Sequence, residues 1–193
     1  MKKLLIGLLF SVITIQAQDI TFGVKAGMNL ANFSSTNIES NLSSRVTFHV
    51  GGVVEIPLTD KLSIQPELLY SEQGVINKVE KINVTAKYNY LNVPIMAKYY
   101  IVDNFSLEVG PQIGFLLSAK AEFEENGRIL EKIDAKKSLE STDFGVNFGL
   151  GYKLKNGLNF GARYNLGLTN ISVDIEDAGI KHGVLQVSIG YNF

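Results

Sequence analysis

Most of the chain alternates between apolar residues and polar or very small ones, and a period of two is typical of β-strands. The alternation is clearest at the C-terminus, where Gln186, Ser188, Gly190 and Asn192 separate five apolar residues. Those five are Leu185, Val187, Ile189, Tyr191 and Phe193. Similar stretches recur along the chain and predict eight strands, at 21–33, 45–56, 62–70, 86–99, 105–117, 143–154, 158–168 and 182–193.

The connections between the predicted strands alternate between long and short. Short turns are expected at 57–61, 102–104 and 155–157, and the last contains Asn156-Gly157, which tolerates the positive φ of a tight hairpin. Polar loops are expected at 34–44, 71–83, 118–142 and 169–181, with a short helix within 127–140 as an alternative to open loop. An even number of strands with short turns on one rim and long loops on the other describes a transmembrane β-barrel.

Two positions interrupt the alternation. Pro66 lies inside the third predicted strand and has no N–H to donate, which predicts a bulge or a bend. In the fourth strand, Tyr88 and Tyr90 share one face, whereas the apolar residues from Leu91 onward share the other. Because a slip of one residue exchanges the two faces of a strand, we predict a bulge near Tyr90-Leu91.

The polarity of the two faces decides between two kinds of barrel. A soluble, lipocalin-like barrel is apolar inside, whereas a membrane barrel is polar inside and apolar outside. The polar face is rich in glycine, which suits an interior in which eight strands leave little room for side chains. Aromatic residues of the apolar face gather near strand ends, as in interfacial girdles. Those expected near the long loops are Phe48, Tyr70, Tyr88, Phe115, Phe144 and Tyr164.

The polar face also carries charges of both signs. Charges inside a narrow barrel are costly unless they are paired, so their mixture predicts a plug of ion pairs rather than a wide channel. The residues expected in this lumen network are Lys25, Arg45, Glu55, Glu67, Lys98, Glu108, Asp143, Lys153 and Arg163.

The first residues form a separate unit. Met1-Lys2-Lys3 is basic, an apolar run extends from Leu4 to Ile15, and the small residue Ala17 follows, which is the layout of a secretory signal peptide. The run is too short for a membrane-spanning helix of about 20 residues, although an N-terminal anchor is an alternative. We expect cleavage after Ala17, which leaves 18–193 as one barrel domain.

Composition narrows the possible functions. Without Lys2 and Lys3 the 18 basic side chains fall to 16, against 19 acidic ones, so the net charge is about −3. This balance does not favour nucleic-acid binding, which calls for a basic patch. The sequence contains no cysteine and therefore neither a disulfide framework nor thiol chemistry.

Two stretches resemble the PorT-like outer-membrane barrels of Bacteroidetes-type bacteria. They are Phe22-Gly-Val-Lys-Ala-Gly-Met-Asn-Leu-Ala-Asn-Phe33 and Tyr90-Leu-Asn-Val-Pro-Ile-Met-Ala-Lys-Tyr99. The resemblance covers nearly the whole mature chain and implies the fold and the location, since the roles of these barrels are diverse. The family member that gives the name acts in protein secretion. In addition, a last strand ending in Phe193 resembles the signal that the barrel-assembly machinery reads in outer-membrane proteins.

Few residues suggest catalysis or ligand binding. Ser172, Asp174 and Asp177 precede His182, which is compatible with a Ser-His-Asp site, but no nucleophile motif supports it, and a polar rim is the simpler interpretation. His49 is expected to face the lumen. An acidic cluster of Glu122, Glu124 and Glu125 lacks the spacing of a calcium loop and is expected to be solvated. No nucleotide or zinc motif is present, and we expect no cofactor.

Two functional hypotheses from different classes remain. The first is a non-catalytic barrel that sits in outer-membrane lipid and presents its loops to surface or secretion partners, as small OmpA/OmpX-type barrels do. The second is a barrel enzyme that acts on lipids. The sequence predicts an all-β, eight-stranded antiparallel barrel in the cell outer membrane under both hypotheses.

Overall fold

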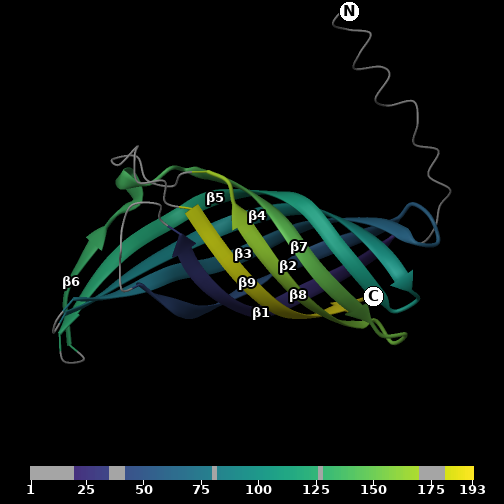
Figure 1. Ribbon diagram of the computed structural model, residues 1–193, viewed down its shortest axis with the longest axis horizontal. Coiled ribbons are helices and arrows are strands. Elements are labelled where there is room, and N and C mark those ends of the chain that lie inside the picture. Colours follow the sequence, from purple (N-terminus) through teal and green to yellow (C-terminus); the bar gives the residue numbers. More distant parts are fainter. Residues whose placement is uncertain (1–19, 35–41, 80–81, 126–127, 170–180) are drawn as a thin grey trace, which may run out of the picture.

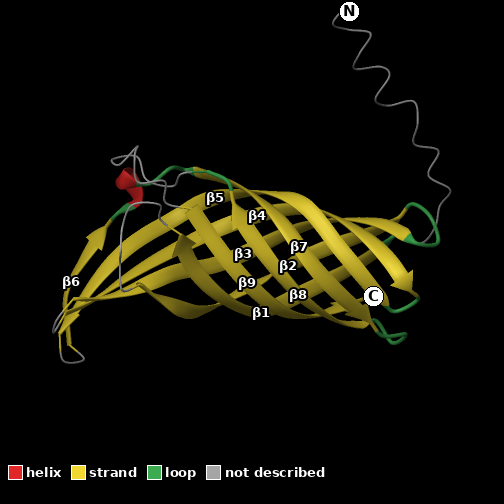
Figure 2. Cartoon of the chain, viewed as in Figure 1, coloured by secondary structure: helices red, strands yellow, loops and turns green. Residues whose placement is uncertain are grey.

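The computed structural model describes residues 20–34, 42–79, 82–125, 128–169 and 181–193, and nearly all of them lie in β-strands (Figure 2). Among them, no helix is long and apolar enough to cross a membrane. The elements are β1 (Thr21–Ser34), β2 (Leu42–Pro57), β3 (Leu62–Val79), β4 (Ile82–Val102), β5 (Phe105–Glu125), β6 (Arg128–Asp134), the short 3₁₀ helix η1 (Lys136–Ser138), β7 (Thr142–Lys153), β8 (Leu158–Gly167) and β9 (Lys181–Asn192).

Eight of the strands close into one antiparallel ring, so the predicted fold is confirmed. The order around the ring is β1, β2, β3, β4, β5, β7, β8 and β9, and β9 pairs with β1 to complete it (Figure 1). The remaining strand, β6, pairs only with β5 among the described residues and stands outside the ring.

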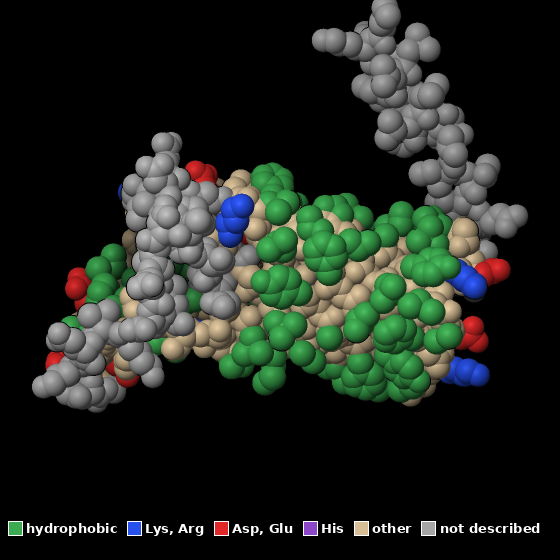
Figure 3. All heavy atoms as spheres, viewed as in Figure 1, with side chains coloured by type: hydrophobic (Ala, Val, Ile, Leu, Met, Phe, Trp, Pro, Cys, Tyr) green, Lys and Arg blue, Asp and Glu red, His purple; other side chains and the backbone are tan. Residues whose placement is uncertain are grey.

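The barrel wall is apolar outside and polar inside. Figure 3 shows apolar side chains over the middle of the visible face, with charged side chains toward its ends. Val24, Phe148 and Ile189 are among the exposed apolar residues, whereas Asn29 and Asn147 are completely buried. This is the reverse of a soluble barrel, and only a lipid environment makes such an outer surface stable.

The short turns lie together at one end of the barrel, as predicted, and we call this end the turn rim. Its turns are residues 58–61, 103–104 and 154–157. Gly157 has φ near +90°, which is the conformation expected at the Asn-Gly turn. The C-terminal strand also ends here, because the N–H of Asn192 donates to the carbonyl of Gly157 over 2.9 Å.

Two predicted loops are wrong, because the chain continues there as sheet. β3 and β4 extend until Val79 pairs with Ile82, and β5 extends to Glu125 before β6 returns beside it. The alternative of a short helix within 127–140 is realised only as the three residues of η1, since the seven residues of β6 occupy half of this stretch. We call the part of this sheet beyond the ring the projecting sheet. It comprises residues 73–79, 82–89, 118–125 and 128–134.

Polarity inverts where the strands leave the ring. Along β4 the outward side chains change from Leu91 to Lys87, and the inward ones change from Asn92 to Tyr88. The projecting sheet is thus polar outside and largely apolar inside, as a sheet in water is. The inversion marks the height at which the outer surface passes from lipid to water. Because the outward residues beyond this height are polar, apolar alternation ends there, and the sequence pattern predicts loops in place of strands.

The bulge predicted in the fourth strand lies in β5 instead. Tyr90 pairs with Leu116, but the next residue, Asn89, pairs with Ser118, so Leu117 is the extra residue. β4 keeps a single register against β3 throughout their pairing. The apparent slip in the sequence of β4 is therefore the inversion of polarity and not a shift of register. Such an extra residue bends the strand locally and increases its twist.

No bulge occurs at Pro66. Gln65, Pro66 and Leu69 pair with β4 in one unbroken register, and the pairing of β3 with β2 is also unshifted at this height. An irregularity instead separates Ser44 from His49 in the pairing of β2 with β3. The alternation of residue types does not reveal it.

Candidate functional site in the barrel lumen

The centre of the lumen is organised around Glu67. Its side chain, on β3, is 0% exposed and receives a bidentate contact from Arg163, at 2.8 and 2.9 Å. The ammonium of Lys25 lies 2.8 Å from the same carboxylate, and the amide of Gln65 donates to it over 2.6 Å. β1, β3 and β8 supply these side chains because every second residue of each strand faces inward.

Arg163 joins this cluster to a second carboxylate. Its Nη2 lies 3.2 Å from Glu108 on β5, and the ammonium of Lys98 on β4 lies 3.5 Å from the other oxygen of Glu108. Lys98 also donates to Gln65 over 3.1 Å. The buried charges therefore form a continuous network that links five strands, β1, β3, β4, β5 and β8, across the barrel.

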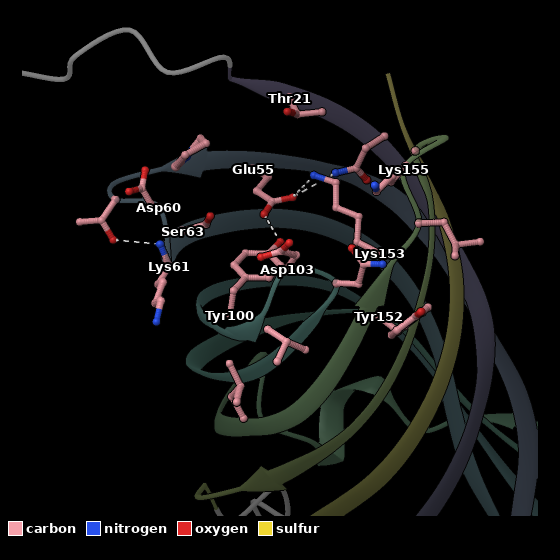
Figure 4. Close-up of a pocket in the computed structure, with 18 residues that line it drawn as sticks. Thr21, Glu55, Asp60, Lys61, Ser63, Tyr100, Asp103, Tyr152, Lys153 and Lys155 are labelled. Atoms are coloured by element: carbon pink, nitrogen blue, oxygen red, sulfur yellow. Dashed lines mark hydrogen bonds and ion pairs between the residues drawn. The ribbon is translucent and has the colours of Figure 1, made fainter.

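A third carboxylate, Glu55, extends the network toward the turn rim. Lys153 contacts it at 2.9 Å, Asn192 donates to it over 3.2 Å, and the hydroxyl of Tyr100 donates to its other oxygen (Figure 4). The ammonium of Lys98 lies 3.9 Å from Glu55 and connects it to the central cluster.

Seven of the nine charged residues expected in the lumen belong to this network. The other two lie elsewhere. Arg45 forms an ion pair with Glu72 at 2.7 Å, and Asp143 is buried near the end of the barrel opposite the turns. One carboxylate oxygen of Asp143 has no hydrogen-bond partner among the described residues.

A neutral polar cluster lies beside the charges. His49 is 1% exposed; its Nδ1 lies 2.8 Å from Oδ1 of Asn29, and its Nε2 lies 3.0 Å from Oγ of Ser188. The amide of Gln186 also donates to Oδ1 of Asn29. No local sequence signal indicates that Ser188 and Asn29, which come from opposite ends of the chain, meet at His49.

The order of serine, imidazole and amide resembles a nucleophile, its base and an orienting group. Ser188 borders a lumen cavity of about 20 Å³, however, which is about the size needed for one water molecule. The cavity has no room for an acyl substrate. We therefore interpret this cluster as part of the lumen packing.

Both ends of the lumen differ from its centre. At the end opposite the turns, Tyr90, Leu116 and Ala119 form a buried apolar cluster against which Tyr88 and Leu139 pack. The expectation that Tyr88 faces lipid is therefore wrong. At the turn rim, a vestibule of about 1310 Å³ opens outward, and Glu55, Tyr100 and Lys153 line it (Figure 4).

The remaining sequence candidates are the residues around His182 and the acidic cluster that begins at Glu122. Ser172, Asp174 and Asp177 lie outside the described residues, as does the side chain of His182. Glu122 is paired rather than freely solvated, at 2.6 Å from Lys87 and 3.1 Å from Lys132, and hydrogen bonds from these two ammonium groups lower its pKa. No group of three or more His, Asp or Glu residues in the described part of the chain could hold a metal ion.

The predicted assembly strand contributes Leu185, Val187, Ile189 and Tyr191 to β9, and Phe193 follows directly after it. All five side chains are exposed on the outer surface. β9 closes the ring between β1 and β8, and the N–H of Phe193 donates to the carbonyl of Phe22 over 2.9 Å. Whether the assembly machinery reads this strand stays a prediction.

The closed lumen predicts a result in electrophysiology. Reconstituted into planar bilayers, the protein should give no large, steady pore current, because ion pairs and the apolar cluster fill the interior between the two rims. A porin reconstituted in parallel provides the positive control. A porin-like conductance would show that the lumen opens in the membrane.

A closed antiparallel ring of eight strands with an apolar exterior defines a membrane-spanning β-barrel. The model of the outer membrane protein β-barrel domain family matches residues 16–173, and the chain belongs to this family. It is therefore an integral protein of the outer membrane. By the convention of such barrels, the turn rim is periplasmic and the projecting sheet is extracellular.

Two solved barrels illustrate the similarity of fold. The attachment invasion locus protein Ail of Yersinia pestis is 16% identical, with a TM-score of 0.56, and the match covers 91% of this chain and 100% of Ail. Neisserial surface protein A is 14% identical, with a TM-score of 0.54 and the same coverages. No curated protein sequence matches the chain significantly. At these identities the similarity concerns the fold alone.

Proposed function

We propose that the protein is a non-catalytic membrane scaffold that presents its projecting sheet to a partner at the cell surface. The observation that carries this proposal is the length of the strands. β4 and β5 have 21 residues each, whereas about 9–11 residues are enough for a tilted strand to cross the membrane. About half of each strand is therefore available for a task outside the lipid.

The end of the projecting sheet is suited to contact. All seven residues of β6 are exposed, including Ile129 and Leu130 at 46% and 56%. Such an edge strand, with pairing described on one side only, is the element that extended peptides commonly add to. The resemblance to PorT-like barrels suggests that the partner belongs to a protein-secretion machine, and we include this role in the proposal.

The lumen supports a non-catalytic role. Seven of its charged groups are used in ion pairs with one another, and the serine beside His49 faces a cavity of water size. The enzyme hypothesis would place chemistry on the residues around His182. Lipid-modifying activity therefore remains an alternative for that segment.

A shortened hairpin tests the proposal. Lys120 on β5 pairs directly with Asp134 on β6. Replacing residues 121–133 with Asn-Gly therefore connects these two paired residues by a new two-residue turn. We expect the barrel to reach the outer membrane at a level similar to the unmodified protein. Partners isolated with the intact protein from native outer membranes should be absent, and proteins exported by the partner machine should be reduced in the medium.

The control is the double variant Asp60→Ala and Asp103→Ala, which alters exposed residues of the turn rim instead. It should keep the same partners and the same exported proteins. If the shortened variant also retains all of them, the projecting sheet is not the presenting surface.

A further inference from the structure

Basic side chains gather on the outward face of the projecting sheet. Lys87 on β4 and Lys120 on β5 are directly paired in register and share this face. Their neighbours Tyr88 and Ala119 face inward and pack in the apolar cluster, so the two lysines point away from the lumen. The ammonium of Lys136 lies 3.0 Å from the carbonyl oxygen of Leu117.

These lysines lie just above the lipid-facing surface. Leu117 is an exposed apolar residue at the upper end of that surface on β5, and Leu91 has the same place on β4. Lys120 and Lys87 follow three and four residues beyond them. With a rise of about 3.3 Å per residue and a tilt of about 45°, they stand roughly 7–9 Å higher. The headgroup layer is about 5–7 Å thick on each side, so the backbone of both residues lies at its outer edge, and their long side chains bring the ammonium groups to headgroup depth.

The acidic side chains nearby leave positive charge uncompensated. Glu122 is shared between Lys87 and Lys132, at 2.6 and 3.1 Å. Asp134, paired with Lys120 in register, accepts a hydrogen bond from the backbone N–H of Lys136 over 2.9 Å. Four lysines thus accompany two acidic residues, and Glu124 lies two residues further from the lipid on the same face as Glu122.

The pairing of Lys87 with Lys120 is unfavourable in isolation, because like charges directly opposite each other destabilise a sheet. An anion between the two ammonium groups would reverse this repulsion. Lysine is a common phosphate binder, since its ammonium group is a compact charge with three donors. In the outer membrane, the anions present at this height are the phosphate groups of lipids in the outer leaflet.

We propose that Lys87, Lys120 and Lys136 bind the phosphate groups of an anionic lipid in the outer leaflet. The acyl chains of this lipid lie along the apolar surface below, beside Leu117 and Leu91. The site fixes the vertical position of the barrel and places the projecting sheet at a constant height above the lipid.

The experiment uses diphosphoryl lipid A as the probe and the intact protein in detergent micelles, with binding measured by native mass spectrometry. The variant Lys120→Gln with Lys136→Gln removes two ammonium groups, neither of which has a described carboxylate within ion-pair distance. At about fivefold per lysine near a membrane surface, the dissociation constant should rise about 25-fold. Phosphatidylcholine, which has no net charge, should bind equally weakly to both proteins.

The matched control is Lys61→Gln with Lys155→Gln, which removes the same charge from the turn rim. It should leave the dissociation constant within about twofold. Equal weakening in both variants, or no weakening in the first, would overturn the proposal. Inorganic phosphate that displaces the lipid at similar concentrations would show a free-phosphate site instead. If the double variant fails to fold, as judged by its gel mobility before and after heating, Lys120→Gln alone should still weaken binding about fivefold.

Discussion

Replacement of Glu67 with Gln should lower the free energy of unfolding by about 3–5 kcal/mol, the cost of removing one partner from a buried ion pair. Glutamine keeps the shape of the side chain but removes its charge. Lys25 then has no carboxylate within the described contacts, and Arg163 retains only Glu108. The cavity of about 20 Å³ beside Lys25 and Arg163 has room for about one water molecule, which is too little solvent to replace the missing charge.

Urea unfolding in lipid vesicles, followed by circular dichroism, measures this effect. The matched control is Glu140→Gln, which makes the same chemical change at an exposed residue outside the network and should change stability by less than about 0.5 kcal/mol. The two variants should thus differ by several kcal/mol. Similar unfolding midpoints and slopes would indicate that water enters the lumen and screens its charges.

Deletion of Phe193 should reduce the amount of protein in the outer membrane several-fold. Its side chain is 73% exposed on the outer surface, so the loss of its contact with lipid costs at most about 1.5–3 kcal/mol. The hydrogen bond from its N–H to Phe22 is lost as well. These losses alone would leave a folded barrel, whereas failure of the assembly machinery to read the strand would leave unfolded chain in the periplasm.

Fractionation and immunoblotting measure this outcome, with Phe160→Ala as the control. Phe160 is also an exposed aromatic residue, but it lies on β8 and away from the terminus. The Phe160 variant should remain near its normal level, and the shortened chain should be depleted or degraded. Equal levels of the two variants would indicate that Phe193 acts only through its contact with lipid.

The barrel itself is predictable from the sequence because the period of a strand is fixed. Alternation assigns each residue to one face, and closure of the ring assigns that face to lipid or lumen. Lys25, Glu67 and Arg163 are placed inside by this rule alone. Their mutual contacts are not predictable in the same way, because Arg163 and Glu67 are 96 residues apart and meet through the tilt of the strands.

Alternation of apolar and polar residues does not predict the projecting sheet, for a physical reason. Alternation distinguishes strands by the environment of each face, and that environment changes from lipid to water near Leu117. Beyond this point the outward residues are charged and resemble a loop, as at Lys87 and Glu122. The cluster of His49, Asn29 and Ser188 escaped prediction because hydrogen-bonding residues at large separation carry no local signal.

The unbroken register of β3 against β4 has a mechanical consequence. β3, β4 and β5 cross the membrane and continue into the projecting sheet without a linker, and the extra residue Leu117 bends β5 at the boundary. A partner bound to the sheet therefore has a fixed orientation relative to the barrel. Binding to a rigid sheet avoids the entropy that is lost when a flexible loop becomes ordered. A mechanical force applied to the sheet is transmitted directly to the wall of the barrel.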